Sequence, residues 1–206
     1  MLADEHSLVR QGLILLLSSE PEIEVVGEAG DGMQAVELAR ALQPDVAVLD
    51  VLLPMLNGAE ATKRLAKASP ATRVLGMSGY SDPLYVREML RAGALGCLLK
   101  EQDQEDFVEA VKSVARGKRY LSPKISAWMV HSKSREGNGN PLDLLTLREL
   151  EILRLLAQGK TNKEVAAVLN RSLYTVDAHR GRIMEKLDLH SASEIVRFAL
   201  RHGLID

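Results

Sequence analysis

Five residues in the first half of the chain have the side chains needed to bind a metal ion and to handle a phosphoryl group. They are Asp4, Glu5, Asp50, Ser78 and Lys100. Three carboxylates in one place repel one another unless a cation neutralises them, and hard oxygen ligands favour Mg²⁺. With a lysine and a hydroxyl, such a metal would neutralise a phosphoryl group, and Asp50 would be the nucleophile that forms an acyl phosphate.

The pattern of the first 120 residues predicts that these five side chains meet. Short apolar runs at 24–29, 45–49, 73–77 and 96–99 are typical of buried strands. Amphipathic segments between them predict helices near 7–18, 32–42, 58–69, 83–92 and 104–116. Strands that alternate with helices indicate an α/β doubly wound parallel sheet, here of five strands. All five residues follow strands, and the carboxyl ends of parallel strands share one edge.

A single member of this set would carry little weight. An aspartate at the end of a strand is usually a turn or cap residue, and a lone serine or lysine is usually a surface residue. Five such residues at strand ends favour the functional interpretation. The first strand is unusually short, because only Met1, Leu2 and Ala3 precede the acids. We expect a shortened central strand to make this domain less stable.

The composition predicts a globular protein with two small domains. Its 206 residues exceed one typical domain, and 46% hydrophobic with 26% charged residues fits neither a disordered nor a fibrous chain. No apolar run is long enough to cross a bilayer, and the start lacks the regions of a signal peptide, which predicts a cytoplasmic protein without a membrane partner. The single cysteine, Cys97, has no disulfide or zinc-ligand partners and is expected to be a small buried residue.

Charge is divided unevenly along the chain. Residues 1–120 hold 13 Lys and Arg against 18 Asp and Glu, net −5, whereas 121–206 hold 13 against 10, net +3. The second half alone is therefore expected to meet phosphates. Ser132–Pro141, rich in Ser, Gly and Asn, is typical of a linker, and a short helix is predicted before it near 123–131.

The second half contains clear helix starts. Capping boxes are predicted for the pairs Thr146 with Glu149, Thr161 with Glu164 and Ser191 with Glu194, and Ser172 is a further predicted cap. These signals indicate an all-α domain of four helices in which the middle two are joined by a tight turn.

The predicted helix over 173–187 has two different faces. Val176, Ile183 and Leu187 form an apolar stripe with His179 beside it. We expect His179 to be packed or to contact phosphate rather than to bind a metal. The opposite face carries Tyr174, Asp177, Ala178, Gly181, Arg182 and Glu185. Its small residues would allow close approach to a groove, although on charge alone a solvated surface explains this face equally well.

Residues 1 to about 118 resemble the receiver domain of response regulators. The matching pieces are Leu-Ala-Asp-Glu-His, Val-Leu-Asp-Val-Leu-Leu-Pro-Met-Leu-Asn-Gly around Asp50, and Leu-Leu-Lys ending at Lys100. The resemblance implies a flavodoxin-like fold in which Asp50 takes phosphate from a phosphohistidine of a sensor kinase. It implies that Glu5, Asp50 and the Leu52 carbonyl bind Mg²⁺ directly and that Asp4 binds it through water. Ser78 and Lys100 would contact the phosphoryl oxygens.

One position departs from the receiver pattern. Cys97, three residues before the lysine, stands where the family usually has Tyr or Phe, so the usual aromatic switch cannot operate unchanged. Tyr80 is the alternative candidate for coupling phosphorylation to dimerisation. Leu52 and Tyr80 also flank the route of water to the acyl phosphate, and as bulky, non-acidic residues they are expected to slow its hydrolysis.

Residues 144–206 resemble the LuxR/NarL-type helix-turn-helix domain. The resemblance lies in Leu-Thr-Leu-Arg-Glu-Leu-Glu, Gly159–Glu164, Thr175-Val176 and His179-Arg180. It implies that the helix over 173–187 enters the major groove of DNA. Expected phosphate contacts are Thr161, Asn162, Lys163, Thr175, Arg180 and Lys186, and expected base contacts are Asp177, Ala178, Gly181 and Arg182. Many relatives have lysine where Asp177 stands; a carboxylate can accept from cytosine N4 but repels phosphate.

We therefore predict a receiver over 1–118, a linker with a short helix over 119–141 and a LuxR-type DNA-binding domain over 142–206. The protein would be a phosphorylation-dependent transcriptional regulator that uses Mg²⁺ and is not an enzyme. Its predicted partners are double-stranded DNA, a cognate sensor histidine kinase and a second copy once phosphorylated, with RNA polymerase as a further candidate. Two alternatives stay open. A phosphatase with an aspartyl phosphate is disfavoured because Leu52 cannot protonate a leaving group, and the other is a receiver that serves only for dimerisation.

Overall fold

The computed structural model describes residues 1–79, 83–133, 141–169 and 171–205, and the chain divides into two units, Met1–Ser134 and Arg135–Asp206. The segment predicted as a linker, 119–141, begins inside the first unit, where it forms β6 (Tyr120–Leu121) and α6 (Pro123–Lys133). This is because β6 pairs with β5 (Gly96–Leu99), and Ile125 of α6 is fully buried. The bounds of the functional domains stay a prediction.

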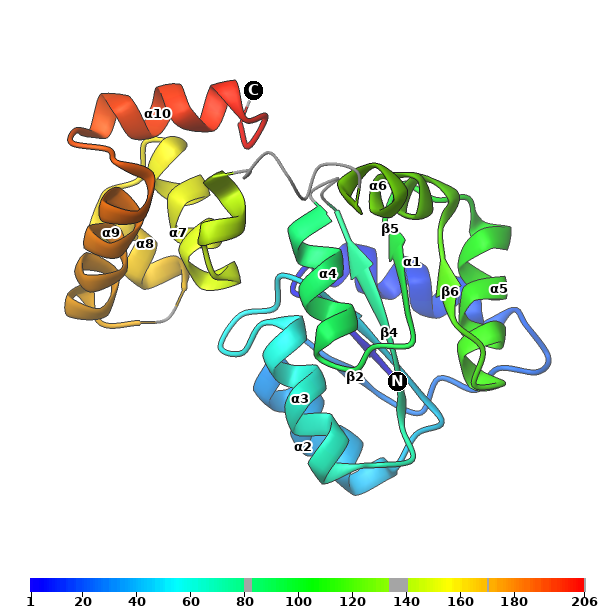
Figure 1. The fold of residues 1–206 in the computed structure, drawn as a ribbon. Coiled ribbons are helices and arrows are strands. Elements are labelled where there is room, and N and C mark those ends of the chain that lie inside the picture. The colour runs from blue at the N-terminus through cyan, green and yellow to red at the C-terminus, as the bar shows by residue number, and fades with distance from the viewer. Residues whose placement is uncertain (80–82, 134–140, 170, 206) are drawn as a thin grey trace. The chain divides into compact units, whose positions relative to one another are not determined.

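A parallel sheet forms the centre of the first unit, with the strand order β2-β1-β3-β4-β5-β6 (Figure 1). Its first four strands along the chain are β1 (Leu2–Ala3), β2 (Glu28–Ala29), β3 (Val46–Asp50) and β4 (Arg73–Ser78). All neighbouring strands run parallel, which confirms the predicted α/β class. The chain order reverses between β1 and β3, and in such sheets ligands bind at the carboxyl ends of the strands that flank this reversal.

Two features of the sheet differ from the prediction. The sheet has a sixth strand, because β6 pairs with the first two residues of β5, and a strand of two residues leaves no recognisable apolar pattern in a sequence. The predicted strand over 24–29 is reduced to Glu28–Ala29, because β1 offers two residues for pairing. The first strand itself is as short as predicted.

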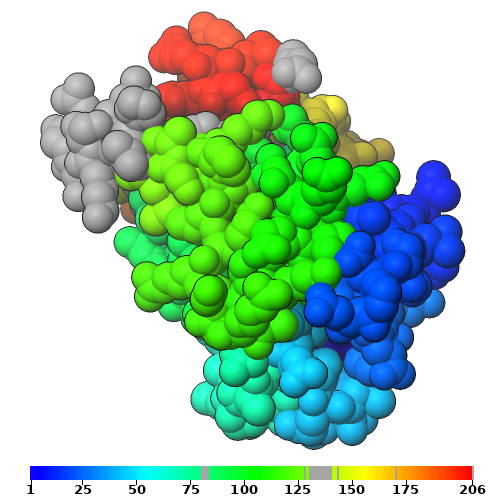
Figure 2. Space-filling model, turned by 90° about the vertical axis from the view of Figure 1, so that its right-hand side faces the viewer, coloured from blue at the N-terminus to red at the C-terminus, as the bar shows by residue number. Residues whose placement is uncertain are grey.

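Helices cover both faces of the sheet. Leu17 of α1 (Ser7–Ser18) and Phe107 of α5 (Gln104–Ala115) pack into one cluster with apolar side chains of β1, β3, β4 and β5. Figure 2 shows this side of the unit, with the N-terminal segment in blue beside the green surface of α5. The opposite face carries α2 (Gly32–Leu42), α3 (Gly58–Ala68) and α4 (Pro83–Arg91) (Figure 1). The predicted helices are confirmed to within two residues at each end.

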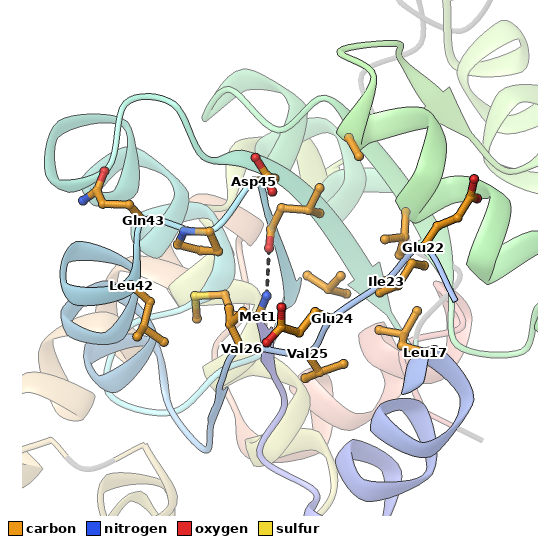
Figure 3. Close-up of a pocket in the computed structure, with 15 residues that line it drawn as sticks. Met1, Leu17, Glu22, Ile23, Glu24, Val25, Val26, Leu42, Gln43 and Asp45 are labelled. Carbon is orange, nitrogen blue, oxygen red and sulfur yellow. Dashed lines mark hydrogen bonds between the residues drawn. The ribbon is translucent and has the colours of Figure 1, made fainter. Parts of the chain in front are cut away.

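A cavity of about 300 Å³ lies beside the amino end of β1 (Figure 3). Apolar side chains line much of it, including Leu17, Val46 and Val48. The terminal amine of Met1 donates a hydrogen bond to the Val46 carbonyl at 2.9 Å. Within the described part of the chain, no backbone hydrogen bond joins 24–26 to β1 or β3. Residues 24–26 therefore line this cavity without being paired to the sheet.

The second unit contains the 3₁₀ turn η1 (Pro141–Leu144) and the helices α7 (Leu147–Ala157), α8 (Asn162–Val168), α9 (Leu173–Leu187) and α10 (Ala192–Arg201). α7 contacts the other three helices, and α8 also contacts α9. Leu150, Leu153, Val165, Val176 and Ile183 are fully buried. The predicted all-helical domain is confirmed. Within the described ranges, no helix is long and apolar enough to cross a membrane.

Side-chain caps start the helices of the second unit. Complete capping boxes stand at the starts of α7 and α8, as predicted, and Ser172 caps α9. The third predicted box is incomplete. Ser191 Oγ accepts a hydrogen bond from the Glu194 amide at 3.2 Å, but the Glu194 carboxylate reaches one residue further back, to the His190 amide at 2.6 Å. The carboxylate still satisfies a backbone donor just before α10.

The cap at Ser191 gives a stability prediction. Ser191→Ala is expected to lower the free energy of unfolding by about 1 kcal/mol, because the Glu194 amide loses its acceptor. Ser191→Asp should retain the wild-type stability, since aspartate caps equally well. Urea unfolding followed by circular dichroism would measure both variants. Equal stability of the alanine and aspartate variants would contradict the assigned cap.

Candidate phosphoryl-transfer site and nucleic-acid interface

Two buried carboxylates and one lysine meet at the carboxyl edge of the sheet. Asp4 follows β1, Asp50 ends β3 and Lys100 follows β5. Asp4 is 0% and Asp50 4% exposed. Lys100 Nζ lies 2.6 Å from Asp50 Oδ2 and 2.6 Å from Asp4 Oδ2. The strand order explains the meeting, because β1 and β4 flank β3 and β5 flanks β4.

The charges of this pocket are not balanced. Burial raises the pKa of the Asp50 carboxyl above its usual range, and Lys100 offsets this only in part. For Lys100, burial acts to lower the pKa, but the Asp50 and Asp4 carboxylates outweigh it, and the pKa of the ammonium is raised. One ammonium therefore faces two buried carboxylates, and a further cation would complete the charge balance.

His6 supplies a third ligand atom within reach of the two aspartates. Ligand atoms of Asp4, His6 and Asp50 lie within 4.8 Å of one another, and His6 Nδ1 is 3.4 Å from Asp4 Oδ1. Glu5 is exposed and, among the described residues, is not part of this group. Partial burial of its carboxyl, together with the nearby Asp50 carboxylate, raises the pKa of Glu5. The buried oxygen donors and the excess negative charge fit a divalent cation such as Mg²⁺. His6 was missed in the sequence, where its signal is its place two residues after Asp4.

Ser78 and Leu52 border the same pocket. Ser78 ends β4 and is 2% exposed, and its carbonyl accepts a hydrogen bond from the Lys100 amide at 2.7 Å. The Leu52 amide donates a hydrogen bond to Asp50 Oδ1 at 3.2 Å, which fixes the orientation of this carboxylate. Tyr80, the predicted alternative switch residue, lies outside the described residues.

Cys97 is buried, 1% exposed, as its sequence context predicts. It stands opposite Gly76 of β4, and a Cβ built on Gly76 would lie 2.8 Å from Cys97 Sγ. Burial raises the pKa of the thiol to about 12. The thiol therefore acts as a neutral packing group on the face of the sheet that α4 covers, in the position that the receiver pattern gives to an aromatic ring.

One face of α9 carries the predicted base contacts. Asp177, Gly181 and Arg182 are exposed and Ala178 is half-buried, while Tyr174, one turn earlier, is 84% exposed. A Cβ built on Gly181 would meet no atom within 4 Å, so the surface beside it is open. On the other side of the helix Val176 and Ile183 are fully buried and Leu187 is half-buried, which agrees with the predicted apolar stripe. α9 is therefore able to present one polar face to a groove.

Most of the predicted phosphate contacts have partners within the unit. Thr161 and Thr175 take part in the caps of α8 and α9, and Arg180 Nη1 donates to Asn162 Oδ1 at 2.9 Å. Lys186 Nζ lies 2.7 Å from Oε2 of Glu149, whose side chain is 3% exposed, and so ties α9 to α7. Lys163 is exposed.

His179 is half-buried beside the apolar stripe, and burial lowers the pKa of its imidazole. A neutral ring at this depth fits the predicted packing role. Whether His179 or the residues with partners inside the unit also contact phosphate stays a prediction.

Both units match known protein families. Residues 1–112 match the response regulator receiver domain, and residues 143–199 match the luxR family of bacterial regulatory proteins. The chain belongs to the two-component response regulators that join a receiver domain to a LuxR-type helix-turn-helix domain, as its sequence motifs predict. Its relatives are transcriptional regulators.

The similarity extends over the full length of several relatives. The oxygen regulatory protein NreC of Staphylococcus carnosus (strain TM300) is 37% identical, over 100% of this chain and 98% of its own. The transcriptional regulatory protein LiaR of Bacillus subtilis (strain 168) is 35% identical over the same shares. The response regulator ChrA of a heme-sensing two-component system is 33% identical, with a TM-score of 0.56 over 100% of this chain and 97% of that chain. A complex of the response regulator RcsB with DNA, 23% identical over 96% of this chain and 95% of that chain, has a TM-score of 0.58 and shares the fold.

Proposed function

We propose that Asp50 accepts a phosphoryl group from a phosphohistidine of a cognate sensor kinase, and that the acyl phosphate controls dimerisation and the binding of α9 to promoter DNA. The observation that carries this proposal is the placement of Asp50. Its carboxylate is 4% exposed at the carboxyl end of β3, with Lys100 Nζ 2.6 Å from Oδ2. The protein would act in the cytoplasm as a regulator and not as an enzyme, with a receiver over 1–118, a linker over 119–141 and a DNA-binding domain over 142–206.

The chemical step is a transfer between two nucleophiles. An Asp50 oxygen attacks the phosphorus atom, the P–N bond of the phosphohistidine breaks, and the imidazole leaves with the electron pair. The Leu52 amide holds Asp50 Oδ1 during the attack. Lys100, already beside Oδ2, lies where charge develops on the phosphoryl oxygens.

Asp4, Asp50 and the Leu52 carbonyl are the residues that would hold Mg²⁺ in the pocket. The exposed Glu5 would have to turn inward to join them, and its oxygen suits Mg²⁺ better than the His6 imidazole does. The metal would supply positive charge against the phosphoryl oxygens. Before transfer, Lys100 Nζ contacts both buried carboxylates. After transfer, Lys100 and the Ser78 hydroxyl would contact phosphoryl oxygens, since Lys100 Nζ already lies beside Asp50 and Ser78 ends β4, the strand next to β3. A shift of Ser78 at the end of β4 would carry the signal onward to α4.

The second unit would bind DNA through α9. The match to the luxR family and the open face around Asp177, Gly181 and Arg182 support this. A net charge of only +3 over 121–206 predicts modest affinity for one copy. Two copies on adjacent half-sites would therefore be needed for useful occupancy. RNA polymerase is the further partner that a promoter-bound regulator would meet.

A phosphodonor tests this proposal. With acetyl phosphate and Mg²⁺, the full chain should gain the mass of one phosphoryl group on Asp50, shift from monomer to dimer in light scattering and bind DNA more tightly at a stated salt concentration. A receiver that serves only for dimerisation would form the same dimer and bind DNA equally well without the donor. That outcome would overturn the proposal.

Leu52 is expected to set the lifetime of the phosphorylated state. Its side chain is half-buried and its amide contacts Asp50. Leu52→Asn should speed loss of the phosphoryl group several-fold, because an amide side chain can orient a water molecule that leucine excludes. Mass spectrometry after removal of acetyl phosphate would follow the decay. Met55→Asn, an exposed change in the same loop, is the control; an unchanged rate in Leu52→Asn would show that crowding does not protect the acyl phosphate.

A further inference from the structure

One carboxamide joins α8 to two charged side chains of α9. Asn162, the first residue of α8, donates a hydrogen bond from Nδ2 to Asp177 Oδ1, and its Oδ1 accepts one from Arg180 Nη1 at 2.9 Å. Both ends of the amide are used, so its orientation is fixed. Asp177 and Arg180 stand one turn apart on α9. The amide between them donates to the Asp177 carboxylate and accepts from the Arg180 guanidinium.

This bridge holds Asp177 in one place on an exposed face. An unsupported aspartate on a helix surface exchanges rotamers freely, whereas a hydrogen bond to a neighbouring helix restricts it. An ionised carboxylate is acceptor-only with about four lone-pair sites, so Asp177 retains acceptors after the bond from Asn162. Gly181, one turn further along the same face, leaves open space beside it. No large side chain at that position would keep a base edge away from the carboxylate.

The chemistry of an acceptor-only group determines which base edge it can bind. In the major groove cytosine presents an amino donor, whereas guanine presents two acceptors and thymine presents an acceptor and a methyl group. Adenine presents an amino donor next to the N7 acceptor, which a carboxylate would repel. A carboxylate fixed at the groove-facing side of α9 is therefore complementary to cytosine.

We propose that Asp177 is the residue that selects a cytosine in the DNA site, and that Asn162 is a positioning residue that holds its carboxylate. The proposal rests on the proposed function, namely that α9 enters the major groove. It replaces the expected role of Asn162 as a phosphate contact. Negative charge on α9 also repels the phosphate backbone, so Asp177 lowers affinity for all sequences while raising discrimination among them. Arg180 offsets part of that repulsion from the other end of the bridge.

The experiment uses the full chain treated with acetyl phosphate and Mg²⁺. Binding sites are first selected from random duplexes, and the affinity for the selected duplex and for all single-base replacements is then measured by fluorescence anisotropy. The unmodified protein should prefer a C·G pair at one position of each half-site by about 10-fold. Asp177→Asn should lose this preference or transfer it to adenine, which asparagine recognises, and should bind unrelated DNA more tightly.

Two further variants separate positioning from folding. Asn162→Asp keeps an acceptor for Arg180 but places a like charge against Asp177, so the preference at that position should fall while preferences at other positions persist. A merely structural role would not change one base position alone. Glu185→Gln removes one negative charge from the exposed surface of α9, as Asp177→Asn does. It should leave the cytosine preference unchanged.

The outcomes distinguish the two levels of the proposal. Duplex binding with the same cytosine preference in Asp177→Asn, or selected sites without a preferred cytosine, would overturn this inference and leave the proposed function standing. Failure of the unmodified phosphorylated protein to bind any duplex would overturn the proposed function, and this inference with it.

Discussion

Asp50→Asn is expected to reduce the transfer of a phosphoryl group from acetyl phosphate by at least about 10³-fold, the scale of loss when a covalent nucleophile is removed. The neutral amide lacks the nucleophilic oxygen and no longer provides the negative charge that attracts a divalent cation. The variant should still fold, because Lys100 keeps its ion pair with Asp4 at 2.6 Å. Intact-mass measurement over time would follow the reaction.

Asp45→Asn is the matched control for this variant. Asp45 is exposed just before β3, at the opposite end of the strand that Asp50 terminates. The Asp45→Asn variant should be phosphorylated on Asp50 at the wild-type rate. If Asp50→Asn gained a phosphoryl group as fast as Asp45→Asn, the acceptor would be a different residue and the assignment of Asp50 would be wrong.

Lys100→Ala is expected to lower the free energy of unfolding of the receiver by about 2–3 kcal/mol in the presence of EDTA, because two buried carboxylates then lack their cation. Protonation of one carboxyl limits the cost. Addition of Mg²⁺ should recover much of the loss, since a cation bound to the folded state alone stabilises it by mass action. Urea unfolding followed by circular dichroism, with and without Mg²⁺, would measure the loss and its recovery.

Lys124→Ala provides the comparison. Lys124 also pairs with a carboxylate, Glu101 at 3.3 Å, but both side chains are more than half exposed. Its loss should change stability by less than about 0.5 kcal/mol, with or without Mg²⁺. Equal effects of the two substitutions in EDTA would mean that burial adds nothing to the Lys100 ion pairs.

Local patterns were enough to predict most elements of the fold. The predicted bounds of α1 and α2 are exact, because their apolar positions recur with helical spacing and flanking residues end the pattern. The pattern over 24–29 was misleading, because apolar residues do not make a strand without a partner, and β1 offers only two residues. Strand formation depends on pairing with residues distant in sequence, which a local pattern does not contain.

The residues of the candidate sites also fall into those that the sequence could predict and those that it could not. The convergence of Asp4, Asp50 and Lys100 follows from their places at strand ends and could be predicted. The ion pair of Lys186 with Glu149 joins residues 37 positions apart, through the packing of α9 on α7, and no local signal reveals it. The bridge from Asn162 to α9 has the same origin. Side chains with partners on another helix are therefore the ones whose roles sequence reasoning assigned least well.

The packing of Cys97 makes this protein convenient to study by chemical labelling. Maleimides react with the ionised form of a thiol, and a pKa of about 12 leaves on the order of 10⁻⁵ of it ionised at neutral pH. Since Cys97 is the one cysteine of the chain, a maleimide dye would label an introduced surface cysteine almost exclusively. Slow modification of the native thiol would then report the opening of the packing between α4 and the sheet, because Met89 of α4 covers the same spot on the sheet face.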